Sequence, residues 1–155
     1  LTDMTRAEGD PSQRPNDPIE LSAMLKEIQT AFDLDATIPD GLRCQGREVL
    51  LRRAIENVVR NAVCHTVGGG KVVLQAEAAQ AGITIRVRDF GPGVPDAMLA
   101  EIFRPFFRVQ PDRSRDSCGV GLGLAIAQRA IRLHHGALSA RNAQPGLEVT
   151  FTLPH

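Results

Sequence analysis

Residues 116–124 read DSCGVGLGL, with glycine at every second position from Gly119 through Gly121 to Gly123, and they open directly into a run of helical character, residues 125–133. Glycine leaves the backbone N–H groups able to approach phosphate oxygens, and the positive end of the following helix favours an anion there. The stretch therefore predicts a phosphate-binding turn in front of a helix. By itself the signal is weak, because Gly-x-Gly-x-Gly also occurs in flexible loops and can imitate half of a dinucleotide fingerprint.

Three further blocks precede this turn, and together they make the signal specific. They are NVVRNA at residues 57–62, DFGPGV at 89–94 and FRPFFR at 103–108. In this order the four blocks resemble the N, G1, F and G2 boxes of the ATP-binding catalytic domain of bacterial two-component sensor histidine kinases. That family belongs to the gyrase, heat-shock chaperone, histidine kinase and mismatch-repair superfamily. The resemblance runs from about residue 18 to residue 154, nearly the whole chain.

The periodicity of apolar residues predicts a fold of mixed helices and strands. Strands adjacent in sequence, mixed with three main helices, favour an α+β two-layer sandwich with a mixed, mostly antiparallel sheet over a doubly wound parallel sheet. The Bergerat-type ATP-binding fold that the resemblance implies has the same form. The predicted helices cover residues 19–32, 48–66 and 122–135, with a shorter one at 96–103, and the predicted strands cover 36–38, 42–44, 71–78, 83–88, 137–141 and 147–153.

The chain organisation follows from the same pattern. Residues 1–8 are predicted to end a preceding dimerisation and phosphoacceptor helix, residues 9–18 to form a linker, and residues 19–155 to form the ATP-binding catalytic domain. The chain has 155 residues, with 18 basic and 18 acidic side chains, so its charge gives no general attraction to nucleic acid. Three widely spaced cysteines without a C-x-x-C pair predict thiols rather than a disulfide or zinc framework.

Two asparagines on the predicted central helix are candidate metal ligands. Asn57 and Asn61 are four residues apart, so their side chains point the same way. Asparagine forms helices poorly, which favours a required ligand set over two solvated amides, although the residues alone leave both readings open. By the resemblance, Asn61 holds Mg²⁺ through its side-chain oxygen and Asn57 contacts phosphate or the metal shell. Arg60 and His65 are expected near the nucleotide, Arg60 because Cys64 stands where the family usually has a basic residue.

The block after the strand predicted at 83–88 is the candidate adenine site. Asp89 ends this alternating strand and is followed by Gly91, Gly93 and Val94. On turn statistics alone, an acid before glycines can be only a turn former. By the resemblance, the buried carboxylate of Asp89 accepts a hydrogen bond from the adenine amino group, and the glycines let the base lie against the backbone. Phe90 departs from the family, which commonly has Asn or Asp there.

The third and fourth blocks supply the candidate contacts to the phosphates. By the resemblance, the phenylalanines of residues 103–107 anchor the base of a mobile lid at about 109–118, and Arg108 reaches the γ-phosphate. A guanidinium suits this task because it binds phosphate oxygens through two hydrogen bonds; the alternative is that Arg108 is an ordinary surface residue. The turn completes the phosphate cradle with Gly119, Val120, Gly121, Leu122 and Gly123. Cys118 stands where the family usually has glycine or serine.

The blocks favour phosphoryl transfer over ATP hydrolysis. In the gyrase-like ATPases, a glutamate four residues before the Mg²⁺-binding asparagine acts as the general base for water. Here that position is Asn57, and an amide cannot take a proton from water at neutral pH. The histidine that accepts the phosphoryl group is therefore expected on a separate helical domain. Neither His134 nor His135 has a carboxylate spaced as in a phosphoaccepting histidine.

The resemblance also implies partners and a location. ATP and Mg²⁺ are the expected cofactors, and the chain's own dimerisation and histidine-acceptor domain and a response regulator are the expected partners, with no nucleic acid. The isolated domain is expected to be monomeric, and the full-length protein to be a dimeric inner-membrane sensor with this domain in the cytoplasm. The alternatives are a regulatory domain that binds nucleotide without turnover and a superfamily ATPase. A dinucleotide oxidoreductase is disfavoured, because its glycines would sit near the first strand.

Overall fold

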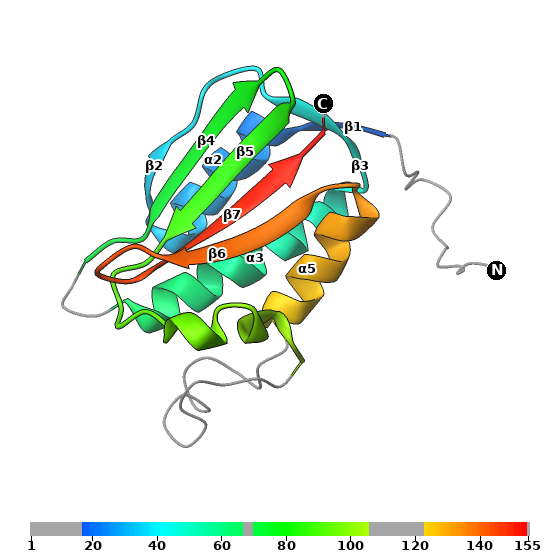
Figure 1. The fold of residues 1–155 in the computed structure, drawn as a ribbon. Helices are drawn as coiled ribbons and strands as arrows, with labels where there is room; N and C mark the ends of the chain where they lie inside the picture. Colours follow the sequence, from blue (N-terminus) through cyan, green and yellow to red (C-terminus); the bar gives the residue numbers. More distant parts are fainter. Residues whose placement is uncertain (1–16, 67–69, 106–122, 155) are drawn as a thin grey trace.

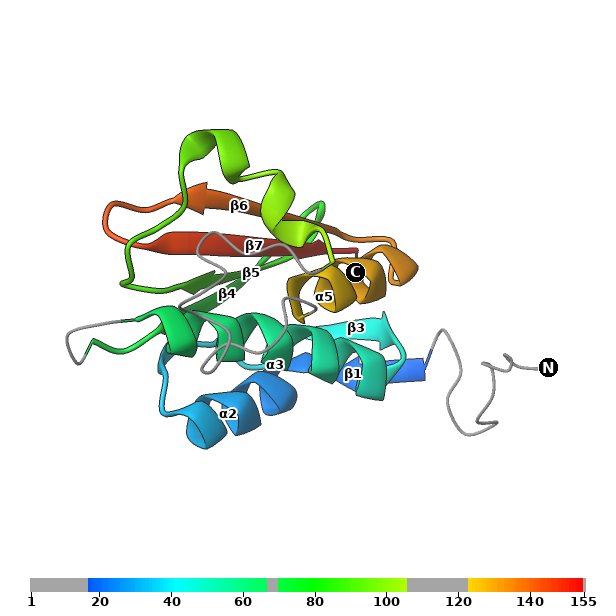
Figure 2. The same cartoon turned by 90° about the horizontal axis from the view of Figure 1, so that it is seen from below.

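A layer of sheet and a layer of helices make up the computed structural model, which describes residues 17–66, 70–105 and 123–154. Within that part, helices α2 (Leu21–Phe32), α3 (Glu48–His65) and α5 (Gly123–Leu133) cover one face of a five-stranded sheet (Figures 1 and 2). The predicted α+β two-layer sandwich is confirmed. The strand order in this sheet is β2 (Asp35–Thr37), β4 (Val73–Ala79), β5 (Gly82–Arg88), β7 (Leu147–Leu153) and β6 (Ala137–Asn142).

The sheet is mixed, and one of its faces packs on the helices. Strand β2 runs parallel to β4, while β4, β5, β7 and β6 pair antiparallel with their neighbours. Side chains of a strand alternate between faces, so Ile83, Ile85 and Val87 of β5 are buried against the helices. Helix α3 buries an apolar stripe against the sheet, made by Leu51, Ala54, Ile55, Val58, Val59 and Ala62.

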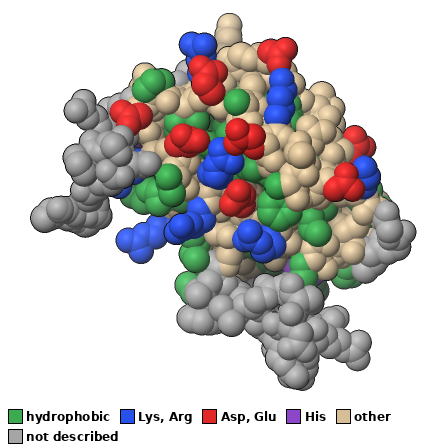
Figure 3. All heavy atoms as spheres, turned by 180° about the vertical axis from the view of Figure 1, so that it is seen from behind, with side chains coloured by type: hydrophobic (Ala, Val, Ile, Leu, Met, Phe, Trp, Pro, Cys, Tyr) green, Lys and Arg blue, Asp and Glu red, His purple; other side chains and the backbone are tan. Residues whose placement is uncertain are grey.

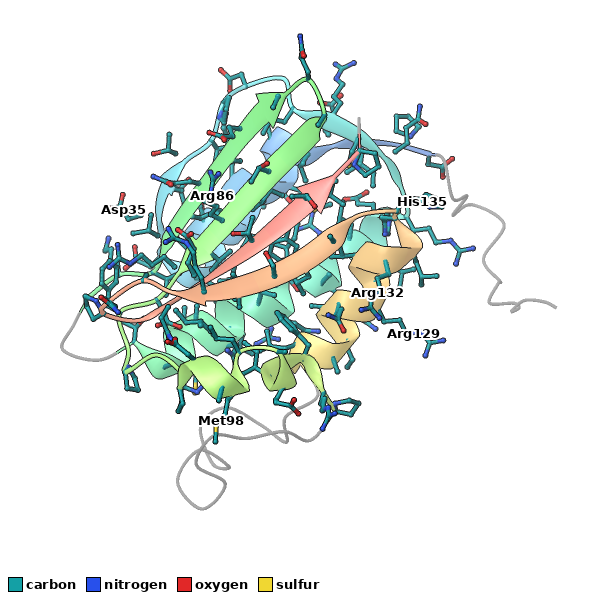
Figure 4. All side chains as sticks on the ribbon, viewed as in Figure 1. Asp35, Arg86, Met98, Arg129, Arg132 and His135 are labelled. Carbon is teal, nitrogen blue, oxygen red and sulfur yellow. The ribbon has the colours of Figure 1, made fainter. Side chains whose placement is uncertain are left out.

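The open face of the sheet carries polar and charged side chains. Arg86 of β5 pairs with Glu77 of β4 at 3.5 Å, and Arg141 of β6 donates to Glu148 of β7 at 2.8 Å. Asp35 and Arg86 lie on this sheet, whereas Arg129 and Arg132 project from α5 away from the fold (Figure 4). On the helical side, basic and acidic side chains are interspersed (Figure 3). Along the antiparallel strands, apolar side chains that face the helices alternate with polar ones on the open face, as expected for a sheet with one solvated face.

The structure differs from the sequence prediction at three places. Strand β1 (Asp17–Glu20), which was not predicted, pairs antiparallel with β3 (Arg43–Gly46) in a separate two-stranded sheet. Asp17 and Pro18 therefore belong to a strand rather than to the predicted linker, and the helix predicted at 19–32 begins only at Leu21. The strands predicted at 36–38 and 42–44 do not pair with each other, because β2 joins β4 and β3 joins β1. The helix predicted at 96–103 is two short 3₁₀ helices, η1 (Asp96–Met98) and η2 (Glu101–Phe103).

A buried histidine joins the end of α5 to the start of α3. His134 is 7% exposed; its Nδ1 lies 2.8 Å from the carbonyl oxygen of Ala130, and its Nε2 accepts the N–H of Arg47 at 3.0 Å. These two bonds require a neutral ring with its proton on Nδ1. A Cβ on Gly46 would lie 2.1 Å from the His134 ring, so only glycine fits beside it. The His134 ring thus caps a carbonyl group near the end of α5.

Replacing His134 by alanine is expected to lower the free energy of unfolding by about 2 kcal/mol, because the change opens a cavity and leaves the Arg47 N–H unpaired. Urea denaturation measures this loss. His135→Asn is the matched control, since His135 is exposed and has a φ of +63°, which asparagine tolerates. We expect the control to stay within about 0.5 kcal/mol of the wild type. Equal losses in the two variants would show that the His134 ring does not join the helices.

Candidate functional site

The carboxylate of Asp89 is buried where β5 ends. Asp89 is 4% exposed, and its Oδ1 accepts the N–H groups of Gly91 and Leu147, both at 3.0 Å. The Asp89 N–H donates in turn to the carbonyl oxygen of Leu147 at 2.9 Å. Both bonds to the carboxylate end on Oδ1 and leave Oδ2 for a further donor. Backbone N–H groups therefore hold the side chain in one orientation before any ligand is present.

The segment after Asp89 fits closely against its neighbours because it contains glycines. A Cβ on Gly91 would lie 2.1 Å from the carbonyl oxygen of His65, at the end of α3. Gly93 has a φ of +75°, and a Cβ there would lie 2.7 Å from Oδ1 of Asn142. The N–H of Val94 donates to that same oxygen at 2.9 Å. Gly91, Gly93 and Val94 thus form a loop held between α3 and the end of β6.

Helix α3 places both asparagines on a partly exposed side. Asn57 and Asn61 are half-buried, one helical turn apart, beside the buried apolar stripe. Nδ1 of His65 lies 2.8 Å from the carbonyl oxygen of Asn61, so the ring folds back on its own helix. Arg60 is exposed; it donates to Oδ1 of Asn57 at 3.4 Å, and its guanidinium carbon lies 5.6 Å from the Phe32 ring centroid. Arg60 is therefore directed toward α2.

The start of α5 lies beside Asn57. A Cβ on Gly123, the first residue of α5, would lie 3.8 Å from the Cβ and 3.9 Å from the carbonyl oxygen of Asn57. The structure thus brings together two blocks that are far apart in sequence, one on α3 and one at the N-terminus of α5. Unpaired N–H groups and the helix dipole make such an N-terminus favourable for an anion. Further predicted phosphate contacts lie outside the described residues, namely Arg108 of the block at 103–108 and Gly119, Val120, Gly121 and Leu122 of the last block.

The turn between β6 and β7 contributes residues that the sequence reasoning missed. Gly146 has a φ of +92°, and a Cβ there would lie 2.0 Å from the carbonyl oxygen of Asp89. Arg88 donates through NH2 to the carbonyl oxygens of Ala143 and Pro145, at 3.3 and 3.2 Å. Pro145 and Gly146 signal a turn in the sequence, but nothing in the sequence indicates that this turn packs on Asp89.

Amide oxygens are the candidate metal ligands. Within the described residues, no group of three or more His, Cys, Asp or Glu side chains is arranged to hold a metal ion. Mg²⁺ bound with nucleotide keeps several waters and needs only one or two protein oxygens. The amides of Asn57 and Asn61, beside a helix start that favours an anion, fit this chemistry. Among the same residues, no helix is long and apolar enough to cross a membrane.

The prediction of free thiols is wrong for Cys64. Cys64, on α3, is disulfide-bonded in the structure, whereas Cys44 is a free, buried thiol. Burial raises the pKa of the Cys44 thiol to about 11, so it stays protonated at neutral pH. Cys44 is therefore expected to contribute to the core and not to react.

Comparisons with known proteins agree with this arrangement. The family described as histidine kinase-, DNA gyrase B-, and HSP90-like ATPase matches residues 46–155. The sensor histidine kinase CpxA of Escherichia coli (strain K12) is 42% identical over 137 residues, which cover 86% of this chain and 29% of CpxA. The mycobacterial sensor histidine kinase MprB superposes with a TM-score of 0.76 and 28% identity, over 90% of this chain and 97% of that one.

Full-length ShkA in complex with AMPPNP superposes with a TM-score of 0.72 and 28% identity, over 90% of this chain and 31% of that chain. The match to CpxA shows that this chain spans less than a third of the length of that relative. The matched blocks, the fold and these relatives agree, and the chain belongs to the family of histidine kinase-, DNA gyrase B- and HSP90-like ATPases, as a catalytic domain of the sensor histidine kinase type.

Proposed function

We propose that the domain binds Mg²⁺ and ATP along α3 and donates the γ-phosphoryl group of ATP to a histidine on a separate helical domain. The observation that carries this proposal is the position of two features along one helix. The start of α5 lies beside Asn57, and Gly91, in the loop that follows Asp89, packs on His65. Asn57 and His65 are eight positions apart on α3, which is about 12 Å along the helix axis. A nucleoside triphosphate can bridge this distance, with its base at Asp89 and its phosphates near Asn57.

The adenine end would be recognised by the Asp89 carboxylate. Gly91 and Leu147 hold Oδ1, and Oδ2 can accept the amino group of the base. Guanine carries a carbonyl at the corresponding position and cannot donate there. Gly93 and Val94 would lie against the base through their backbone. The complex of ShkA with AMPPNP supports an adenine nucleotide as the ligand of this fold.

The phosphate end would be held by the start of α5 and the amides of α3. Asn61 and Asn57 would hold Mg²⁺ through their side-chain oxygens. When it is bound, the metal ion would neutralise charge on the phosphates. The residues predicted for the rest of the cradle are Arg108, Gly119, Val120, Gly121, Leu122 and Gly123, and Arg60 and His65 remain predicted neighbours of the nucleotide. The histidine nitrogen forms a bond to the γ-phosphorus as the bond from that phosphorus to the bridging oxygen breaks, and ADP leaves. The domain contributes position and charge stabilisation.

Calorimetric titration of ATP, ADP and GTP into the domain, with and without Mg²⁺, tests the binding step. Tighter binding of ATP than of GTP, strengthened by Mg²⁺, is the expected result. Transfer is then tested by adding the helical domain that precedes the catalytic domain in the full-length protein, with ATP labelled at the γ-phosphate. Binding without transfer would favour a nucleotide-binding regulatory domain, and release of labelled phosphate without a labelled protein would favour a superfamily ATPase.

Mg²⁺ is expected to strengthen ATP binding by the wild type, and replacing Asn61 by alanine is expected to make this effect of Mg²⁺ about tenfold smaller, because an oxygen ligand is lost. The affinity without Mg²⁺ is expected to change little. Calorimetry at several Mg²⁺ concentrations measures both. Asn61→Asp is the matched control, since a carboxylate keeps an oxygen at the same position. An Ala variant with the Mg²⁺ dependence of the wild type would remove Asn61 from the metal site.

The partners and location that we propose are those of a sensor kinase. The preceding dimerisation and histidine-acceptor domain would present the histidine, and a response regulator aspartate would receive the phosphoryl group in turn. The full-length protein would be a dimer in the inner membrane with this domain in the cytoplasm, and the isolated domain would be a monomer. The family membership of the chain and the names of its relatives as sensor proteins support this proposal.

A further inference from the structure

The turn from Asn142 to Leu147, here named the β6–β7 turn, crosses the segment that follows Asp89. We propose that Asn142 is a positioning residue for the adenine side of the nucleotide pocket, acting through the backbone of Gly93 and Val94. This inference rests on the proposed function, because it concerns the same pocket. Asn142 is not expected to touch the nucleotide itself.

The side chain of Asn142 pairs with the backbone of Val94 in both directions. Its Oδ1 accepts the Val94 N–H at 2.9 Å, and its Nδ2 donates both to the Val94 carbonyl oxygen and to Oδ1 of Asp96, the latter at 2.9 Å. A carboxamide offers an acceptor and a donor side by side, so it can satisfy both backbone groups of one residue. The oxygen of Asn142 also occupies the place that a Cβ on Gly93 would take, at 2.7 Å. Asn142 thus fixes the path of the backbone at Gly93 and Val94.

The β6–β7 turn is itself held by the residues on either side of Asp89. Arg88 donates through NH2 to the carbonyl oxygens of Ala143 and Pro145, and its guanidinium carbon lies 4.6 Å from the Phe90 ring centroid. Among the described residues, Nε of Arg88 is a buried side-chain nitrogen without a hydrogen-bond partner. The attraction between this cation and the face of the Phe90 ring therefore contributes to the position of Arg88.

Asp89 completes the connection between the turn and the pocket. Its Oδ1 accepts the Leu147 N–H at 3.0 Å, and its N–H donates to the Leu147 carbonyl oxygen at 2.9 Å. The turn is thus tied to Asp89 at its Leu147 end and to Val94 at its Asn142 end. Loss of the Asn142 amide would release the Val94 end alone. The loop would then shift against the base, while Asp89 keeps its two backbone donors.

Three variants of the chain separate this role from a general effect on stability. Asn142→Ala removes both bonds to Val94. Asn142→Asp keeps an acceptor for the Val94 N–H but loses the donor and sets a carboxylate against Asp96. The double variant Asn142→Asp with Asp96→Asn restores a donor and acceptor pair between the two positions. Ser139→Ala is the matched control, because Ser139 is exposed on the same strand.

The dissociation constants of ATP and GTP are measured by calorimetry at a temperature at which circular dichroism shows every variant to be folded. Asn142→Ala is expected to weaken ATP binding about tenfold, with less effect on GTP, so that the preference for ATP narrows. Asn142→Asp is expected to behave similarly, the double variant to recover part of the loss, and Ser139→Ala to match the wild type.

Two results would overturn the inference, and they are distinguishable. If the wild type prefers ATP over GTP and Asn142→Ala keeps both the affinity and the preference, Asn142 does not position the pocket, and the proposed function stands. If the wild type shows no preference for ATP, the proposed function fails and the inference fails with it.

Discussion

Replacing Gly146 by alanine is expected to lower the free energy of unfolding by about 4 kcal/mol, the largest stability effect that we predict. The backbone φ of +92° is one that a residue with a side chain rarely adopts. The added Cβ would also lie 2.0 Å from the carbonyl oxygen and 2.7 Å from the carbonyl carbon of Asp89. These are backbone atoms, so they cannot move aside without disturbing β5. Native domains are stable by about 5–15 kcal/mol, so the loss would remove about a quarter of that stability or more.

Urea denaturation of the nucleotide-free domain measures this loss, and Gly41→Ala is the matched control. Gly41 has a similar φ of +82°, but nothing lies within 4 Å of the position of its Cβ. The control therefore carries the backbone strain without the collision, and we expect a loss of about 1 kcal/mol. Equal losses at the two positions would show that the contact between the β6–β7 turn and Asp89 is looser than the structure indicates.

Replacing Asp89 by asparagine is expected to weaken ATP binding about 100-fold, equivalent to about 2.7 kcal/mol, and to remove the preference for ATP over GTP. The amide keeps an oxygen for the N–H groups of Gly91 and Leu147. It then places an NH₂ group where Oδ2 would meet the adenine amino group, so two donors face each other. The stability of the nucleotide-free domain is expected to change far less than ATP affinity. Calorimetry with ATP and GTP, combined with urea denaturation, measures both effects.

Asp35→Asn is the control for this change, because Asp35 is exposed on the edge strand β2. It is expected to bind both nucleotides as the wild type does. An Asp89→Asn variant that still prefers ATP by the same factor would mean that the carboxylate does not read the base. In that case its two backbone bonds would be its whole role, and Asp89→Ala would reduce stability and leave selectivity intact.

Sequence periodicity was sufficient for the elements with a long buried face. Helix α3 and strand β5 each bury a regular stripe, and both lie where the pattern predicted them. Strand β1 could not be found in this way, because Ile19 alone is buried among its four residues and Pro18 is unusual within a strand. Residues 96–103 bury only Ile102, which is too little apolar surface to stabilise a continuous helix.

The sequence indicated the candidate residues that stand in short local blocks, but not the contacts that join residues far apart in the chain. Asp89 and Asn57 stand in recognisable blocks, and the structure brings Asn57 next to Gly123. Asn142 reaches Val94 across 48 residues of sequence, and no local pattern signals such a pairing. The parallel pairing of β2 with β4 is hidden for the same reason, since the Pro39 turn indicates only a change of direction.

The contact between Asp89 and Leu147 spans 58 residues, and this has a consequence for the newly made chain. At ordinary rates of translation, Asp89 leaves the ribosome roughly 3 to 12 s before Leu147 does. During that interval the strand that will flank Asp89 in the finished sheet has not been made, and its carboxylate lacks one of its two backbone donors. A nascent chain that already carries every recognisable block therefore still lacks one of the Asp89 donors, and under the proposed function the site is complete only once β7 has been made.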